Sequence, residues 1–109
     1  MGDGTVGFHI AEYDTAVRYR LPFVSVIGND ARWNAEYQIQ LRDYGADRLL
    51  GCDLRPMRYD TVAEAFGGHG ELVSEPHAMA AAIQRAQASD LPACVNVMIE
   101  GVPAPQIRR

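Results

Sequence analysis

Short apolar runs that alternate with helix-like segments are the feature that most limits the fold of this chain. Two of them, FVSVIG at 23–28 and PACVNVMIEG at 92–101, are mostly apolar at successive positions, so both faces of each strand must be covered. A third, shorter strand is expected at 71–73. Strands that are buried on both faces and separated by helices form parallel sheets, because a parallel connection needs a crossover. The sequence therefore predicts an α/β fold with a parallel sheet flanked by helices.

The first half of the chain contains two segments with helical character. Ile10, Tyr13 and Val17 recur at helical spacing, which predicts a helix over about 6–19. Residues 34–45 have a weaker pattern and are expected to hold only a helical turn or two, ended by the glycine at its last position.

The second half of the chain contains two clearer helices. The first is predicted over 59–68, with Asp60 or Thr61 near its start and a pair of glycines at its end. The second is predicted over 75–89, with Ser74 as its N-cap and a proline in its first turn.

Composition limits the class of protein. The chain has 109 residues, enough for one domain, and a net charge of -4, which argues against non-specific binding to nucleic acid or to an anionic membrane surface. No apolar run is long enough to span a bilayer, and no signal peptide is seen, so a cytoplasmic location is expected. All ten basic residues are arginines, which excludes lysine nucleophiles within this chain.

Cysteines and histidines give no metal or redox signal. Cys94 lies inside an apolar run and is expected in the core, whereas Cys52 follows a glycine in a loop and is expected to be more exposed. The two cysteines lack the C-x-x-C spacing of zinc or redox sites, and the three histidines lack metal-ligand spacing.

The N-terminus carries the strongest chemical signal. Residues 2–7, GDGTVG, form a G-x-G-x-x-G pattern, whose glycines commonly let backbone N–H groups approach a phosphate. The pattern is short, and three interpretations compete. It can be a flexible turn before a helix, a dinucleotide loop in which Asp30 binds a ribose, or part of a metal site that pairs Asp3 with Asp30.

The acidic residue within the glycine pattern favours the metal. A carboxylate at Asp3 would repel a diphosphate by on the order of a few kcal/mol. A divalent cation between the two groups reverses the sign of that interaction, and Mg²⁺ is commonly held by one or two carboxylates together with substrate phosphates. Asp3 and Asp30 are both expected at strand ends of a parallel sheet, the edge where such sheets bind ligands. The pair therefore indicates a metal-diphosphate site.

These residues also carry a family resemblance. GDG at 2–4 is followed, after the 24 residues 5–28, by Asn29 and Asp30, which resembles the GDG and paired-asparagine signature of thiamine diphosphate enzymes. The surrounding sequence from Gly2 to Trp33 is similar to the branch of acetolactate synthases, 2-hydroxyacyl-CoA lyases and benzaldehyde lyases, and LPACVNVMI is similar to the closing strand of the same domain. The departure is Asp30 in place of the second asparagine, which still supplies an oxygen and adds a negative charge.

The resemblance implies a cofactor and a set of site residues. The cofactors are thiamine diphosphate and Mg²⁺, and the implied metal ligands are the side chains of Asp3 and Asp30 and the backbone carbonyl of Arg32. The cofactor-binding residues expected from the resemblance are Gly2, Asp3, Gly4, Thr5, Asn29, Asp30, Arg32 and Trp33. Asn29 is expected to order the loop, and Trp33 either lines the cofactor pocket or packs beneath that loop.

The resemblance also implies that the site is incomplete. A phosphate loop of this type follows a strand, and only Met1 precedes the glycines, so the chain is expected to be the second part of a diphosphate-binding domain that lacks its first strand. Residues 103–109 are expected to form a tail. We expect no catalytic residue within this chain, a need for further domains or a second subunit, and a homo-oligomeric parent enzyme that makes or breaks C–C bonds next to a carbonyl. The alternative is a stand-alone, Rossmann-like module that binds a nucleotide or diphosphate without catalysis.

Overall fold

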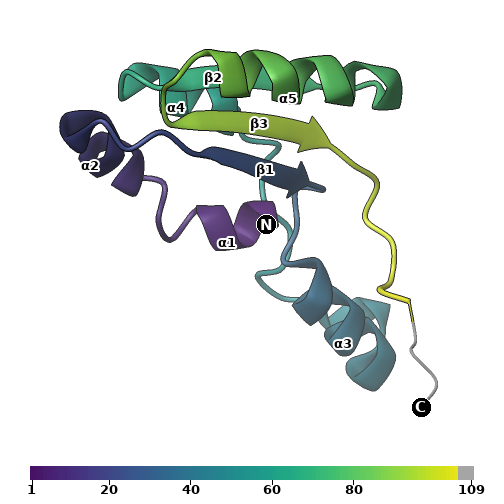
Figure 1. Ribbon diagram of the computed structural model, residues 1–109. Coiled ribbons are helices and arrows are strands. Elements are labelled where there is room, and N and C mark those ends of the chain that lie inside the picture. The colour runs from purple at the N-terminus through teal and green to yellow at the C-terminus, as the bar shows by residue number, and fades with distance from the viewer. Residues whose placement is uncertain (106–109) are drawn as a thin grey trace.

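A computed structural model describes residues 1–105 and has a parallel sheet at its centre (Figure 1). Its strands are β1 (Val24–Asn29), β2 (His69–Val73) and β3 (Ala93–Met98), in the order β1-β3-β2, and both strand pairs are parallel. The parallel α/β sheet predicted from the apolar runs is confirmed, although β2 begins two residues before the predicted 71–73. All three strands therefore end at the same edge of the sheet.

Helices flank the strands. They are α1 (Asp3–Val6), α2 (Glu12–Tyr19), α3 (Asn34–Tyr44), α4 (Tyr59–Ala65) and α5 (Met79–Ala88), with 3₁₀ turns η1 (Ala46–Arg48) and η2 (Pro76–Ala78). All of the α-helices except α3 pack on one of the two faces of the sheet. Among the residues described, no helix combines the length and the apolar character that crossing a membrane requires.

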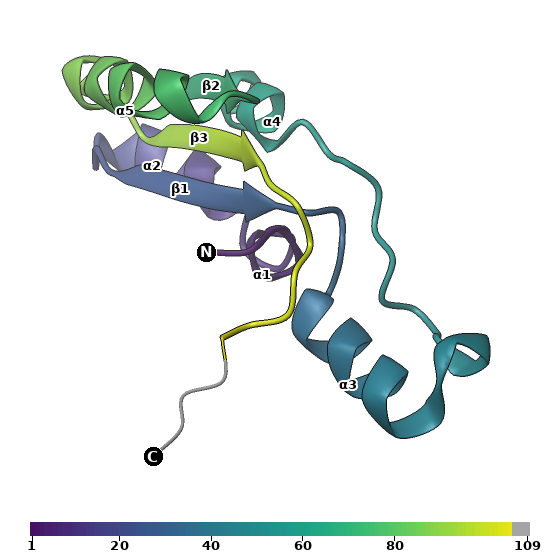
Figure 2. The same ribbon diagram turned by 90° about the vertical axis from the view of Figure 1, so that its right-hand side faces the viewer.

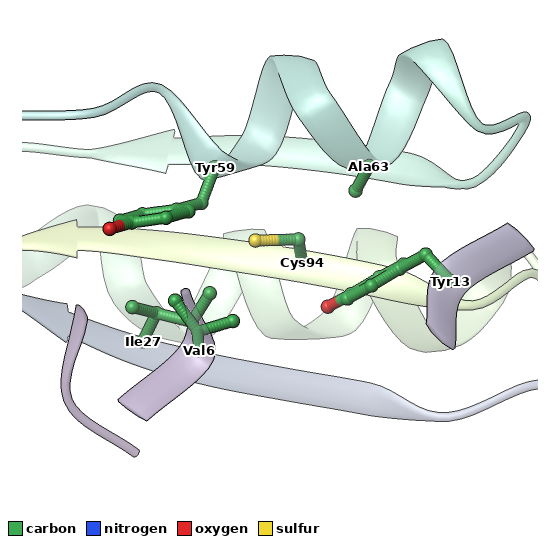
Figure 3. Close-up of a cluster of buried hydrophobic side chains, with 6 residues drawn as sticks. All are labelled: Val6, Tyr13, Ile27, Tyr59, Ala63 and Cys94. Atoms are coloured by element: carbon green, nitrogen blue, oxygen red, sulfur yellow. The ribbon is translucent and has the colours of Figure 1, made fainter. Parts of the chain in front are cut away.

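Alternate residues of the central strand divide the core into two parts. Cys94 faces α1, α2 and α4, while Ala93 and Val95 face α5. The first cluster is drawn in Figure 3 and consists of Val6, Tyr13, Ile27, Tyr59, Ala63 and Cys94. The second consists of Val73, Ala82, Ala86, Ala93 and Val95. Cys94 is fully buried in the core, as predicted, and this burial raises the pKa of its thiol to about 12.

The first two residues extend the sheet next to β1. The backbone N–H of Gly28 donates to the carbonyl of Met1 at 2.8 Å, and Gly2 forms a parallel bridge with Gly28. The glycine pattern thus starts at the carboxyl edge of the sheet, beside the end of β1, and the chain enters α1 directly from this extended segment.

Two predicted helices differ from the structure in the first half of the chain. The single helix expected over 6–19 is divided into α1 and α2, and GDG forms the start of α1 instead of a loop before it. The segment 34–45 forms the regular 11-residue helix α3, ended as expected by Gly45, whose φ is 85°. Every residue of α3 is at least partly exposed, and Figure 2 shows this helix standing apart from the sheet. Without packing on the sheet, α3 needs no apolar stripe, which explains its weak pattern.

Asp60 and Thr61 lie in the first turn of α4, as expected, although Arg58 occupies the N-cap position and no side chain caps this helix. Two smaller expectations were wrong. Ser74 caps no helix, because η2 intervenes and its N-cap is Glu75. Cys52 is buried, with 4% of its surface exposed, because the segment around it pairs with the residues after β1. Of the predicted tail 103–109, residues 103–105 lie outside any helix or strand and 106–109 lie outside the described residues.

Candidate metal and diphosphate site

A pocket of about 420 Å³ opens at the carboxyl edge of the sheet, beside the ends of Met1–Gly2 and β1. This is the edge at which parallel α/β sheets bind ligands. The structure brings seven of the eight predicted site residues to its wall: Gly2, Asp3, Gly4, Thr5, Asp30, Arg32 and Trp33. The eighth, Asn29, lies beneath the pocket and is fully buried.

Asp3 is the unusual group of this pocket. Only 1% of its surface is exposed, and its Oδ2 is a buried side-chain oxygen without a hydrogen-bond partner among the described residues. Burial raises the pKa of Asp3, the backbone N–H of Gly4 opposes that shift, and the charge of Asp30 raises it further. The Tyr59 hydroxyl donates to the backbone carbonyl of Asp3 at 3.2 Å, which fixes the start of α1. A buried, unpaired carboxylate next to a second one is a position that a cation would stabilise.

Arg32 presents its backbone to the pocket. Its neighbours pair in antiparallel fashion with the segment 52–54: the N–H of Trp33 donates to Cys52 at 2.8 Å, and the carbonyl of Ala31 accepts from Leu54 at 2.7 Å. In such a pair the N–H and C=O of the middle residue point away from the partner segment. Arg32 and Asp3 both line the pocket, so the backbone of Arg32 that points away from Asp53 points to the side of Asp3, and its N–H lowers the pKa of that carboxylate.

The side chain of Arg32 is held elsewhere. Its Nε donates to Asp53 at 3.0 Å, and its guanidinium lies 4.3 Å from the centre of the Tyr37 ring. These contacts leave the backbone carbonyl of Arg32, and not its guanidinium, as the group best placed to act as a ligand in the pocket.

Trp33 covers the glycine pattern as well as lining the pocket. A Cβ added to Gly4 would lie 2.8 Å from the Trp33 ring, which is closer than real Cβ contacts come. The Trp33 ring also packs with the ring of Phe8, with 5.3 Å between their centroids. Trp33 therefore both lines this pocket and packs against the glycine pattern, and glycine is needed at position 4 for this close approach.

Any metal in this pocket must draw on more than side chains. Among residues 1–105, no group of three or more His, Cys, Asp or Glu side chains is arranged to hold a metal ion. The pocket instead combines two carboxylates, Asp3 and Asp30, with the inward-facing backbone of Arg32. Such a set of hard oxygen groups, completed by water or phosphate, suits Mg²⁺.

Sequence reasoning missed a second layer beneath the pocket. Asn96, Asp60 and Asn29 form a buried, hydrogen-bonded group with the carbonyl of Met57. The available signal was Asn96 itself, a single amide within the apolar run ACVNVM. A polar side chain inside a strand that is buried on both faces must find buried partners.

Comparison with known proteins gives the family. The family described as thiamine pyrophosphate enzyme, C-terminal TPP binding domain, matches residues 1–97. The chain belongs to this family. Thiamine pyrophosphate is the same compound as thiamine diphosphate, so the resemblance seen in GDG and the Asn29–Asp30 pair is confirmed.

Curated relatives in this family are much longer than the chain. A probable acetolactate synthase of Mycobacterium bovis is 48% identical over 100 residues, which cover 91% of this chain and 18% of that protein. A 2-hydroxyacyl-CoA lyase 2 of Caenorhabditis elegans is 35% identical over 104 residues, or 90% of this chain and 16% of the relative. The chain thus spans less than one fifth of these relatives.

Solved structures share the fold. A thiamine diphosphate-dependent 4-hydroxybenzoylformate decarboxylase of Rhodococcus jostii aligns with a TM-score of 0.83 at 24% identity, over 92% of this chain and 19% of that one. Benzoylformate decarboxylase of Polynucleobacter necessarius aligns with a TM-score of 0.85 at 18% identity, over 97% of this chain and 20% of that one. The sheet and its flanking helices are those of the cofactor-binding domain of this family.

Proposed function

We propose that this chain is the part of a thiamine diphosphate-dependent enzyme that anchors the cofactor's diphosphate through Mg²⁺. The parent enzyme would make or break a C–C bond next to a carbonyl, as an acetolactate synthase, lyase or decarboxylase does. One observation carries the proposal: a buried carboxylate oxygen of Asp3 has no partner among the described residues and lies at the pocket beside Asp30.

The electrostatics of the pocket support a metal. Like charges in one pocket repel, so the carboxylates of Asp3 and Asp30 oppose each other, and a diphosphate would add to this repulsion. The charge of Asp30 already raises the pKa of Asp3. A divalent cation shared by both carboxylates and the diphosphate turns these repulsions into attractions.

The residues that would hold the metal and the diphosphate all belong to the pocket wall. Asp3, Asp30 and the backbone carbonyl of Arg32 would be the metal ligands. Gly4 and Thr5 lie in the first turn of α1, where backbone N–H groups have no intrahelical partner. The N–H of Gly4 acts on the Asp3 carboxylate, so the N–H of Thr5 would be the donor to phosphate oxygens. The thiazolium ring of the bound cofactor supplies the electron-accepting chemistry, and the protein supplies position.

A thermal unfolding experiment tests the metal-diphosphate site against the dinucleotide interpretation. With Mg²⁺ and thiamine diphosphate at about ten times the dissociation constant, the chain is expected to gain roughly 1.4 kcal/mol, which raises Tm by about 5 °C or more. The same cofactor with a chelator, and NAD with Mg²⁺, are expected to leave Tm unchanged. A shift of equal size with the chelator would contradict the metal bridge, and a shift with NAD would favour Asp30 as a ribose ligand.

The chain alone is expected to show no carboligase, lyase or decarboxylase activity. The family resemblance assigns the carboxylate that activates the cofactor's aminopyrimidine to another domain, and this chain spans under one fifth of its relatives. The outer edge of β1 beyond Met1–Gly2, and the exposed α3, are the surfaces where further domains or a second copy would pack. The measurement is turnover of 2-keto acids and aldehydes with Mg²⁺ and thiamine diphosphate. Turnover above the free-cofactor background would show that a complete site lies within these 109 residues.

A further inference from the structure

A chain of buried hydrogen bonds runs from α4 through the central strand to the loop that follows β1. Asp60 accepts from Asn96 at 3.1 Å, and Asn96 accepts from Asn29 at 3.1 Å. The amide nitrogens of both asparagines also donate to the carbonyl of Met57, at 2.9 Å from Asn29 and 3.0 Å from Asn96. Asn29 and Asn96 are fully buried, and 3% of Asp60 is exposed.

The direction of this chain is fixed by groups that can only accept. A carboxylate and a backbone carbonyl have no proton to donate, so Asn96 must turn its NH₂ group toward Asp60 and Met57. Its amide oxygen then faces Asn29, which must in turn present its own NH₂ group. Arg58 contributes hydrogen bonds of 2.6 Å and 3.1 Å to Asp60, which keep that carboxylate charged.

The orientation of the Asn29 amide sets the backbone conformation of the loop that follows β1. Because its NH₂ group donates to Met57 and Asn96, its amide oxygen is left to accept a hydrogen bond from the N–H of Ala31, at 3.2 Å. Ala31 has a φ of 57°, in the left-handed region that residues with a side chain rarely adopt. This turn places the next residue, Arg32, with its backbone toward Asp3.

We propose that Asn96, oriented by Asp60, is the positioning residue that holds Asn29 and the strained Ala31, and so aims the Arg32 carbonyl into the metal pocket. Asn96 lines no part of the pocket itself, so it would act only through Asn29. This inference rests on the proposed Mg²⁺-diphosphate function. Outer partners that orient metal ligands typically change metal affinity by about 10–100-fold when they are removed.

The test compares three variants of the chain by calorimetry with Mg²⁺ in the presence of thiamine diphosphate. Asn96→Ala removes the hydrogen bonds that join Asp60 to Asn29. Asp60→Asn keeps the side-chain volume, but residue 60 can then donate as well as accept, so the amide groups of Asn96 and Asn29 are no longer held in one orientation. Val95→Ala is the matched control, because Val95 is the preceding residue on β3, is equally buried and faces α5 instead. We expect about 10–100-fold weaker Mg²⁺ binding for Asn96→Ala, a smaller loss for Asp60→Asn, and less than about 2-fold for Val95→Ala, which also loses thermal stability.

A second readout follows the loop without any ligand. Amide hydrogen exchange at Ala31 is expected to be faster in Asn96→Ala and Asp60→Asn than in the wild type, and unchanged in Val95→Ala.

Two results would overturn the positioning role alone: equal Mg²⁺ affinity in the wild type, Asn96→Ala and Asp60→Asn, or unchanged exchange at Ala31. A wild-type chain that does not bind Mg²⁺ with thiamine diphosphate would overturn the proposed function and this inference together. If Asn96→Ala does not fold, Asp60→Asn carries the same comparison.

Discussion

Asp3→Asn is expected to weaken Mg²⁺-dependent binding of thiamine diphosphate by more than about 100-fold, because even outer partners of metal ligands are worth about 10–100-fold. The same substitution is expected to leave the thermal stability of the cofactor-free chain unchanged or higher. Isothermal calorimetry measures the first effect, and thermal unfolding without ligand measures the second.

The two effects have one physical cause. The carboxylate of Asp3 is buried with one oxygen unpartnered, an arrangement that costs free energy in the absence of a cation. An amide of the same shape removes the charge and the repulsion from Asp30 while keeping an oxygen for the N–H groups of Gly4 and Arg32. A residue that destabilises the free protein but binds the ligand is typical of functional sites.

The matched control is Asp53→Asn. Asp53 also carries a negative charge beside the pocket loop, but it pairs with the Arg32 side chain, is largely exposed and lies outside the pocket wall. Exposed ion pairs contribute about 0–1 kcal/mol, so this variant is expected to change cofactor affinity by no more than about 5-fold. Equal losses in the two variants would show that net charge near the loop, and not Asp3 as a ligand, governs binding.

The parallel sheet and the grouping of Asp3 with Asp30 could both be predicted from the sequence. Parallel strands were predictable because FVSVIG and PACVNVMIEG are apolar at successive positions, which only a sheet covered on both faces can satisfy. The grouping of Asp3 with Asp30 at one edge was predictable because parallel strands end at the same side. Both predictions rest on local pattern and on a rule of topology.

The parts that were missed depend on contacts between distant segments. The amide of Asn96 meets Asp60 and Asn29 only once β3 lies between α4 and β1, and no spacing in the sequence encodes that meeting. The length and regularity of α3 were underestimated, because none of its residues is buried and the helix therefore needs no apolar stripe that the sequence could show. The apolar spacing also did not show that the helix expected over 6–19 is divided at residues 7–11.

Gly70→Ala is expected to destabilise the chain by about 3 kcal/mol, at the upper end of the usual cost of overpacking, and to reduce cofactor affinity as well. A Cβ at Gly70 would lie 2.5 Å from the backbone carbonyl oxygen of Asp60 and 2.9 Å from its carbonyl carbon. Because these are backbone atoms, β2 and α4 must separate to admit the methyl group. Urea or thermal unfolding measures the loss of stability.

The same substitution is expected to affect the site because two residues at the start of α4 support the pocket. Tyr59 donates to the backbone of Asp3, and Asp60 orients Asn96, so a shift of α4 disturbs both supports of the pocket. Gly7→Ala is the matched control, since Gly7 has the helical φ of -56° and a Cβ there makes only ordinary contacts at 3.5 Å and beyond. That variant is expected to be neutral or to gain up to about 1 kcal/mol. A Gly70→Ala chain as stable as the Gly7→Ala chain would show that α4 does not pack against β2 as closely as the structure has it, and would remove this support from the pocket.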